Sequence, residues 1–498
     1  MPAISTGEPG AAGVAETHAG VVFFVGDRAF KLKKPVNLGF LDFSTRERRE
    51  RACHREVELN RRFSPDVYLG VADVTLASGL PCDHLVIMRR MPAERRLSHL
   101  VETGVPVDDA LRAIARLLAR VHASAPRGEH ISAEATRDAV RRRWIDGFDQ
   151  VRPFHGRAID AQEATEIERR ALRFLDGRER LFDSRIREGR VIDGHGDLLA
   201  DDIFCLDDGP RVLDCLDFDD RLRRLDGLDD AAFLCMDLER LNAPRLGEHF
   251  LAWYAEFADD PAPPSLRHHY IAYRAFVRAK VSCLRWDQGE AGAAATAGRY
   301  AEMALRHLNA GAVRVILVGG LPGTGKSALS EALGDRLGYT VINSDRIRKE
   351  LADVSPDVSA AAAFGAGIYT AFWNRRTYAE MLKRATRLLS YGESVILDAS
   401  WTSAEFRADA AALPHADLTA LNCHTHLAEE RLRTRTAGVS DADPAIAARM
   451  AETAAPWPDA VPIDTSGPVE RSVELALRAI RPPGAAHSWH RRPQLAPG

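Results

Sequence analysis

The pattern of apolar and polar positions divides the chain into a β-rich start, a long helical middle and a final segment in which strands and helices alternate. Two apolar runs flank Gly26 and Asp27, and this arrangement is typical of a β-hairpin. From Asp108 onward, apolar residues recur at helical spacing. The first predicted elements are a hairpin over 21–34, a charged helix over 45–63, a strand over 85–88 and a helix from 108.

The middle of the chain is predicted to be mainly helical. In order, we expect helices over 159–189, short strands over 191–218, a helical block over 228–257, a further helix from 266, and a connection through 291–298 and 308–313. The uncharged stretch 358–374 is too short for a membrane span and is expected to be a buried or lid-side helix.

These patterns place a domain boundary near residue 310. The first domain, 1–310, is expected to have a small β-rich lobe over about 16–92 and a helical lobe over about 93–310. The second domain is expected over 311–482, and the Pro-, Gly- and His-rich tail 483–498 is expected to be disordered. The predicted fold class is therefore mixed α/β and α+β in two domains.

The second domain opens with an apolar strand that runs directly into a glycine-rich segment. Glycines let successive backbone N–H groups turn toward one anion, Lys326 can reach the β- and γ-phosphates of ATP, and Ser327 can hold Mg²⁺. The predicted phosphate cradle comprises Gly320, Leu321, Pro322, Gly323, Thr324, Gly325, Lys326, Ser327 and Ala328. This pattern predicts ATP binding.

Composition narrows the classes of partner. Charged residues make up 28% of the chain and the formal net charge is −4, so a general basic field for nucleic acid or an anionic membrane is not expected. The seven cysteines are scattered and form no CxxC pair, which favours free thiols in a reducing cytoplasm over a zinc site. Met1 to Gly20 lacks the basic and apolar regions of a secretory signal.

The upstream domain carries two acidic segments, His195-Gly196-Asp197 and Val212-Leu213-Asp214. Two carboxylates on loops around a short hairpin suit phosphoryl transfer to a hydroxyl, in which one accepts the proton and the other holds Mg²⁺. The region from about 16 to 305 resembles the aminoglycoside phosphotransferase and choline kinase superfamily, which has the protein-kinase-like fold.

This resemblance implies Asp197 as catalytic base and Asp214 as metal-binding acid. It also implies that Lys31 pairs with Glu56, although Lys33 lies on the same strand face and the choice between the two lysines stays open. No GxGxxG loop precedes the hairpin.

The sequence also departs from the family at the position five residues after Asp197, where the family has Asn and this chain has Asp202. Asp can also bind Mg²⁺, but repulsion between Asp202 and Asp214 would be roughly 4 kcal/mol at about 4 Å and an effective dielectric near 20. We therefore expect a site unusually dependent on Mg²⁺ or Mn²⁺. Arg274 and Arg278 are expected on a solvated helix face, with binding of an anionic substrate as the alternative, and His122 is expected to be packed or hydrogen-bonded.

In the downstream domain, two further apolar strands end near acids, Asp345 and Asp398. Ligands collect at the carboxyl ends of parallel strands, so both acids should face the γ-phosphate and share the work of base and Mg²⁺ support. Arg431, Arg433 and Arg435 fall in one helical stretch that could close over the phosphate as a lid.

Residues 313–480 resemble P-loop kinases of the polynucleotide kinase and gluconate kinase type. The resemblance implies Asp345 as base and Ser344-Asp345-x-x-Arg348 as the acceptor-side motif. It also assigns Asp398 and Arg407 to the second strand, and Arg431 and Arg435 to the lid.

Taken together, the chain resembles bacterial fusions of a phosphotransferase and an ATPase. We expect two Mg·ATP sites that move the γ-phosphate of ATP to a hydroxyl of a sugar, amino sugar, aminoglycoside or nucleoside-like acceptor. The alternative is that the first domain is a non-catalytic ligand sensor that regulates the P-loop domain. The weak basic balance makes nucleic acid a poor candidate acceptor.

Overall fold

The computed structural model describes residues 13–16, 19–37, 42–355, 365–434 and 443–480. It divides the chain into two compact units. Unit 1 comprises Met1–Arg169, Phe182–Ala262 and Leu266–Leu308, and unit 2 comprises Arg170–Leu181, Pro263–Ser265 and Asn309–Gly498. The predicted tail, 483–498, lies outside the described residues. No described helix combines the length and the apolar composition that a membrane crossing requires.

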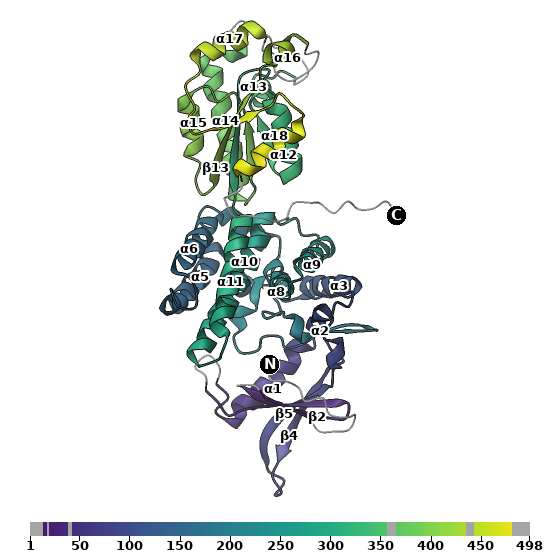
Figure 1. The fold of residues 1–498 in the computed structure, drawn as a ribbon. Coiled ribbons are helices and arrows are strands. Elements are labelled where there is room, and N and C mark those ends of the chain that lie inside the picture. Colours follow the sequence, from purple (N-terminus) through teal and green to yellow (C-terminus); the bar gives the residue numbers. More distant parts are fainter. Residues whose placement is uncertain (1–12, 17–18, 38–41, 356–364, 435–442, 481–498) are drawn as a thin grey trace. The chain divides into compact units, whose positions relative to one another are not determined.

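Unit 1 begins with a five-stranded antiparallel sheet in the order β1-β2-β3-β5-β4, with α1 packed against it (Figure 1). These elements are β1 (Gly13–Glu16), β2 (Gly20–Val25), β3 (Arg28–Lys33), α1 (Arg46–Asn60), β4 (Tyr68–Thr75) and β5 (Pro81–Arg89). The predicted hairpin is formed by β2 and β3 around Gly26, whose φ of 57° is a conformation that glycine adopts at little cost.

Helices and two short hairpins follow the sheet. The helices are α2 (Leu97–Glu102), α3 (Asp108–Ser124), α4 (Glu129–Ser132), α5 (Arg137–Val151), α6 (Ala161–Leu175), α7 (Glu179–Arg187), α8 (Gly227–Arg240), α9 (Pro244–Phe257), α10 (Pro264–Asp287) and α11 (Ala293–Ala310). One hairpin pairs β6 (Val191–Asp193) with β9 (Arg224–Asp226), and the other pairs β7 (Ile203–Leu206) with β8 (Gly209–Val212). The sheet and the helices give unit 1 the bilobal protein-kinase-like fold that the sequence predicted.

Two sequence expectations for the helical part need correction. The predicted block over 228–257 is two helices, because Asn242 takes a left-handed φ of 60° and Pro244 starts α9. The predicted connection over 291–298 and 308–313 is mostly helix α11, since alanine has the highest helix propensity and buried Tyr300 and Leu308 anchor the helix.

Unit 2 contains a five-stranded sheet in the order β11-β12-β10-β13-β14, and all of its neighbouring strands are parallel. Its strands are β10 (Arg314–Gly319), β11 (Thr340–Asn343), β12 (Val395–Asp398), β13 (Asp417–His424) and β14 (Val461–Asp464). Its helices are α12 (Lys326–Leu337), α13 (Ser344–Leu351), α14 (Ala371–Ser390), α15 (Ala404–Ala411), α16 (Ala428–Thr434), α17 (Pro444–Thr453) and α18 (Val469–Ile480). This is the predicted P-loop fold. Of the predicted helix over 358–374, residues 358–364 lie outside the described residues, and α14 begins only at Ala371.

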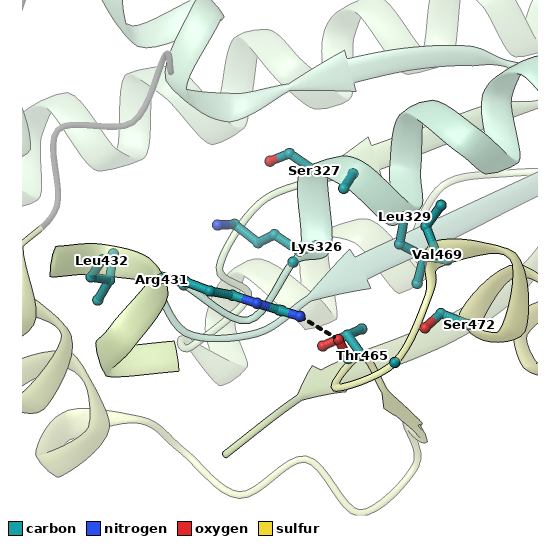
Figure 2. A pocket seen from close by; sticks show the side chains of 12 residues that line it. Lys326, Ser327, Leu329, Arg431, Leu432, Thr465, Val469 and Ser472 are labelled. Carbon is teal, nitrogen blue, oxygen red and sulfur yellow. Dashed lines mark hydrogen bonds between the residues drawn. The ribbon is translucent and has the colours of Figure 1, made fainter. Parts of the chain in front are cut away.

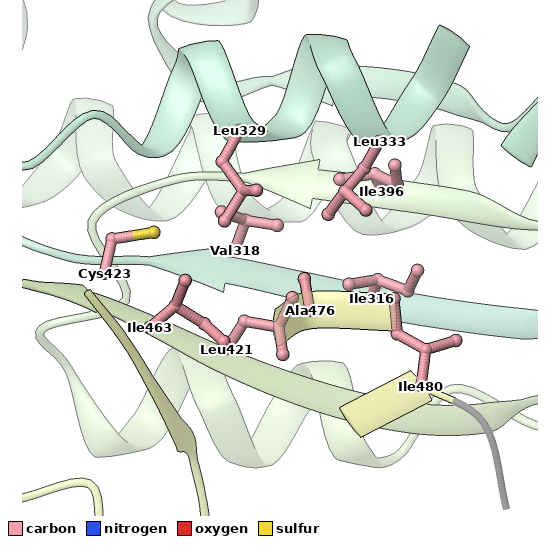
Figure 3. Packing of buried hydrophobic residues seen from close by; sticks show 10 residues of the cluster. All are labelled: Ile316, Val318, Leu329, Leu333, Ile396, Leu421, Cys423, Ile463, Ala476 and Ile480. Atoms are coloured by element: carbon pink, nitrogen blue, oxygen red, sulfur yellow. The ribbon is translucent and has the colours of Figure 1, made fainter. Parts of the chain in front are cut away.

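Helices cover both faces of this sheet (Figure 1). On one face, apolar side chains of the strands meet α12 and α18, as Figure 3 shows. The cluster is Ile316, Val318, Leu329, Leu333, Ile396, Leu421, Cys423, Ile463, Ala476 and Ile480, all 8% exposed or less. Because side chains alternate along a strand, Leu317 lies on the opposite face and is also buried. This packing holds the carboxyl ends of the strands, where the predicted acids lie, in fixed positions.

Candidate functional sites

A buried glutamate binds two lysines in the small lobe of unit 1. Lys31 Nζ lies 2.8 Å from Glu56 Oε1, and Lys33 Nζ lies 2.8 Å from Glu56 Oε2. The two lysines share a face of β3 because side chains alternate along a strand. Burial alone would raise the pKa of Glu56, but the two ammonium groups lower it to about 2. The carboxylate is therefore held in its charged form.

The second contacts of the two lysines differ. Lys31 Nζ lies 2.9 Å from Asp214 Oδ1, the predicted metal-binding acid, whereas Lys33 Nζ lies 2.9 Å from Asp217 Oδ2. Lys33 is 4% exposed. The geometry therefore favours Lys31 as the lysine that faces a nucleotide, and it gives Lys33 and Asp217 a structural role that the sequence reasoning did not assign.

Asp230 on α8 binds the backbone of the loop that carries Asp197. Asp230 Oδ2 accepts a hydrogen bond from His195 N at 2.6 Å, and Oδ1 accepts one from Gly196 N at 2.9 Å. His122 is buried, as expected, and contacts the same carboxylate at 3.2 Å. These contacts lower the pKa of Asp230 against the effect of burial, so the loop is bound to a fixed negative charge.

Three carboxylates, Asp197, Asp202 and Asp214, lie within each other's electrostatic field. Burial raises the pKa of Asp197 to about 6, Arg278 opposes this, and Asp214 adds to it. Burial, Asp214 and then Asp197 raise the pKa of Asp202 well above its usual range. Asp214 has a left-handed φ of 62°, an unusual conformation for a residue with a side chain.

This donor set fits Mg²⁺. Carboxylate oxygens are its preferred protein ligands, and concentrated negative charge is stabilised by a divalent cation. Among the described residues, no group of three or more His, Cys, Asp or Glu side chains is placed so that it could hold a metal ion by itself. Magnesium commonly uses one or two carboxylates and completes its shell with water and substrate phosphates, so an open pair of acids suits it.

Both predictions for Arg274 are wrong, namely a position on a solvated helix face and a role in binding an anionic substrate. Its guanidinium is 6% exposed and makes a bidentate pair with Asp229, at 2.7 Å and 2.9 Å. Arg274 therefore contributes to the core of unit 1, and it neither faces solvent nor stands ready for a substrate. A second bond, to Gly196 O at 3.3 Å, links it to the Asp197 loop.

In unit 2, the predicted phosphate cradle connects β10 to α12. Gly320, Gly323 and Gly325 have φ values of 140°, 81° and 77°, which residues with side chains rarely adopt. At Gly323 a Cβ atom would lie 2.5 Å from the Ala428 carbonyl oxygen. The cradle therefore needs glycine for its backbone conformation and, at Gly323, for space.

A cavity of 330 Å³ lies beside the cradle (Figure 2). Its lining includes Lys326, Ser327, Arg431, Thr465 and Val469. Arg431 reaches it because its Nη2 donates to Thr465 O at 2.7 Å. The other lid residues differ: Arg433 pairs with Glu429 on the exposed side of α16, and Arg435 lies outside the described residues.

The two acids of unit 2 lie at the predicted strand ends. Asn343 and Asp398 are paired in register on β11 and β12, and Asn343 Nδ2 donates to Asp398 Oδ2 at 2.6 Å. Burial raises the pKa of Asp398, while Lys326, the Ser327 hydroxyl and Asn343 oppose the rise. Ser327 and Asp398 therefore offer adjacent oxygen donors that fit Mg²⁺.

A larger cavity, of 580 Å³, is also lined by Lys326, and its lining includes Asp345 and Arg348. Residues that the sequence reasoning did not identify complete its lining, among them Tyr369, Asn374, Tyr378, Phe406, Ile446 and Met450. No local motif marks these residues, because they come from the short 3-10 helix Gly367–Tyr369, α14, α15 and α17 and so do not form one stretch of the sequence. Arg407, expected on the second strand, instead lies on α15 and donates to the carbonyl oxygens of Trp401, Ala455 and Pro456.

A family model and several solved structures match parts of the chain. A family model described as AAA domain matches residues 315–456, which confirms the predicted P-loop domain. Solved structures similar to parts of the chain include a gluconokinase from Sinorhizobium meliloti (19% identity, 34% of this chain, 91% of that chain, TM-score 0.24). A choline/ethanolamine kinase family protein from Mesorhizobium loti is similar over 60% of this chain and 92% of its own (13% identity, TM-score 0.37).

Two mycobacterial proteins match nearly the whole chain. The uncharacterized proteins Rv2004c of Mycobacterium tuberculosis and Mb2027c of Mycobacterium bovis are each 45% identical to it over 473 residues, which is 94% of this chain and 95% of each relative. The chain therefore belongs to the family of these two mycobacterial proteins.

Proposed function

We propose that unit 2 is a small-molecule kinase that moves the γ-phosphate of ATP to a hydroxyl group. The observation that carries this proposal is that Lys326 lines both cavities, so the phosphate cradle stands between a space for nucleotide and a space for acceptor. A regulatory ATPase needs only the first of these spaces. The second, with Asp345 in its wall, supports transfer to a bound alcohol.

The roles in unit 2 follow from position. Asp345 accepts the proton of the acceptor hydroxyl, because it lies in the wall of the acceptor cavity close to Lys326. Lys326 and Arg431 bind phosphate oxygens and stabilise the charge that develops during transfer. Ser327 and Asp398 would hold Mg²⁺, which neutralises phosphate charge when it is bound.

We further propose that unit 1 is a second phosphotransferase site. Lys31, positioned by Glu56, binds nucleotide phosphates, and Asp197 accepts the proton of a second acceptor. Asp202 and Asp214 would hold Mg²⁺ or Mn²⁺. Because Asp202 is a carboxylate where the family has an amide, Asp202→Asn should weaken metal binding, which isothermal titration with Mn²⁺ measures. Unchanged affinity and an unchanged pH profile would contradict that role.

A ligand sensor in unit 1 is the competing function. The ion pair between Lys31 and Asp214 favours the sensor function, because the two charges neutralise each other and a bound nucleotide would have to break the contact. The pairing of Lys31 with Glu56 favours catalysis, because it holds the lysine where phosphates would lie.

All seven cysteines are free, and this supports a reducing compartment such as the cytoplasm.

One experiment separates these possibilities. The intact protein is given labelled Mg·ATP and a panel of sugars, amino sugars, aminoglycosides and nucleosides, and labelled products are counted. Lys326→Ala should remove the products of unit 2 alone, and Asp197→Ala those of unit 1 alone. If Asp197→Ala removes no product but changes how ligands affect unit 2, unit 1 is the sensor. If Lys326→Ala leaves all transfer intact, the assignment of unit 2 is wrong.

A further inference from the structure

The larger cavity of unit 2 is lined by both charged and apolar side chains. The charged residues are Lys326, Asp345 and Arg348, which come from the cradle and from α13. The large apolar and aromatic side chains come from α14, α15 and α17, namely Tyr378, Phe406, Ile446 and Met450, and the lining also includes the hydroxyl groups of Ser400, Thr402, Ser403 and Thr453. A molecule that fills this cavity must therefore satisfy both kinds of surface.

Arg348 is a buried cation whose partners are neutral. It is 6% exposed, and its Nη1 donates to Asn374 Oδ1 at 2.7 Å and to Ile368 O at 3.2 Å. Its Nε has no hydrogen-bond partner, and in the described part of the chain its guanidinium bonds only to uncharged oxygens. The guanidinium also lies 5.0 Å from the centroid of the Tyr369 ring. Because no carboxylate of the described residues is hydrogen-bonded to this buried charge, an anionic group on a ligand would be stabilised here.

Arg348 also lies one helical turn after Asp345 on α13. Residues three apart on a helix have Cβ atoms about 5–6 Å apart and project from the same side. A hydroxyl placed at Asp345 and an anion placed at Arg348 would therefore lie on the same edge of one ligand. A carboxylate suits this position because it accepts two hydrogen bonds from a guanidinium.

The aromatic side chains of the lining are suited to a flat ring. The rings of Tyr378 and Phe406 stack on each other with centroids 4.1 Å apart and an angle of 13° between their planes, and both residues line the cavity. Ile446 and Met450 lie four residues apart on α17 and add aliphatic surface. A flat apolar group on a ligand would gain from burial and dispersion against these side chains. The volume of 580 Å³ falls in the range of about 300–1,000 Å³ typical of pockets for drug-sized ligands.

We propose that the acceptor of unit 2 is an aromatic or similarly flat alcohol that carries a carboxylate on the same edge as its reacting hydroxyl. This proposal rests on the kinase function given above and narrows it, since simple sugars and neutral nucleosides lack one of the required features. Arg348 selects the carboxylate, Asp345 faces the hydroxyl, and the wall of Tyr378 and Phe406 selects the ring.

Calorimetric titration of the full-length protein with three probes tests the proposal. meta-Hydroxymethylbenzoate has all three features, meta-hydroxymethylbenzamide lacks the charge, and gluconate lacks the ring. We expect the benzoate to bind at least tenfold more tightly than either of the others. Equal affinity for the benzoate and the benzamide, tighter binding of gluconate, or no saturable binding of the benzoate at millimolar concentration would each overturn the proposal.

Matched variants assign the effect to this cavity. Arg348→Gln should abolish the preference for benzoate over benzamide, and Arg346→Gln, an exposed arginine on the same helix, should preserve it. Met450 is half-buried, so Met450→Ser should leave the fold intact, and it should lower the affinities for the benzoate and the benzamide by a similar factor. If the Arg348→Gln and Met450→Ser variants both bind the benzoate as tightly as the natural protein does, the benzoate binds elsewhere and the proposal is wrong.

A separate readout distinguishes failure of this inference from failure of the kinase function. Binding of a fluorescent ATP analogue, compared between the natural chain and Lys326→Ala, reports the nucleotide site alone. Normal ATP binding together with no carboxylate preference overturns only the acceptor class. Carboxylate-dependent binding of the benzoate without any Lys326-dependent ATP binding supports the acceptor class and overturns the kinase function.

Discussion

Replacing Asp197 with asparagine should stabilise the metal-free protein at neutral pH while it abolishes phosphate transfer by unit 1. Burial raises the pKa of Asp197 to about 6 in the folded protein, with Arg278 opposing and Asp214 reinforcing the shift. An aspartate in an unfolded chain has a pKa of about 3.9. The folded protein therefore binds this proton more tightly than the unfolded chain does.

The sign and size of the effect follow from this difference. Between about pH 4 and pH 6 the folded state holds more protons, so the free energy of unfolding falls as pH rises through this range. A shift of about two pKa units corresponds to a loss of up to about 3 kcal/mol, at about 1.4 kcal/mol per unit. Asparagine carries no charge, so Asp197→Asn should remove this loss. The gain should be near zero below about pH 4 and largest above about pH 6.

The measurement must report unit 1 rather than the whole chain. Trp144 is fully buried in unit 1, so its resonance in a fluorotryptophan-labelled protein can be followed through urea unfolding in EDTA. Asp287→Asn, which removes an exposed carboxylate at the end of α10, is the control and should change stability by less than about 0.5 kcal/mol at any pH. A gain of equal size at about pH 4 and pH 8, or no gain at pH 8, would refute the reasoning from burial.

Three further changes test other parts of the structure. Asp230→Ala removes the acceptor of two buried backbone N–H groups and should lower the free energy of unfolding of unit 1 by about 3 kcal/mol. The same urea unfolding experiment measures this loss. A change below about 0.5 kcal/mol would contradict the role of Asp230 in holding the loop. Gly323→Ala places a Cβ atom 2.5 Å from the Ala428 carbonyl oxygen and should lower ATP affinity in unit 2 at least tenfold, whereas Gly289→Ala, at a similar φ but with open space, should not. Glu56→Gln should cost about 1.5–3 kcal/mol near neutral pH, because it removes the carboxylate that the two lysines share while each lysine keeps its second carboxylate partner. Since the pKa of Glu56 is lowered to about 2, the difference from the natural chain should shrink as pH falls from about 4 toward 2, and a difference independent of pH would argue against the ion pair.

The local sequence was sufficient to predict those elements that depend on residues close together in the chain. The turn at Gly26, the strand before the cradle and the start of α12 at Lys326 all appear as predicted, because each depends on residues a few positions apart. The same holds for the strand end at Asp398, which a parallel sheet brings next to Asn343. Alanine-rich α11 was missed because its composition also suits a connection, and the choice depended on burial of Tyr300 and other residues.

The sequence by itself determined that the chain contains a phosphate cradle, two pairs of acids at loop and strand ends, and two domains. Only the tertiary structure decided which lysine faces Asp214, that Arg274 is a core ion pair, and what kind of surface lies opposite Asp345. The physical reason is the range of the interactions involved. A cradle is made by consecutive backbone groups, whereas the partner of a charge and the wall of a cavity come from residues far apart in the chain, which only folding brings together.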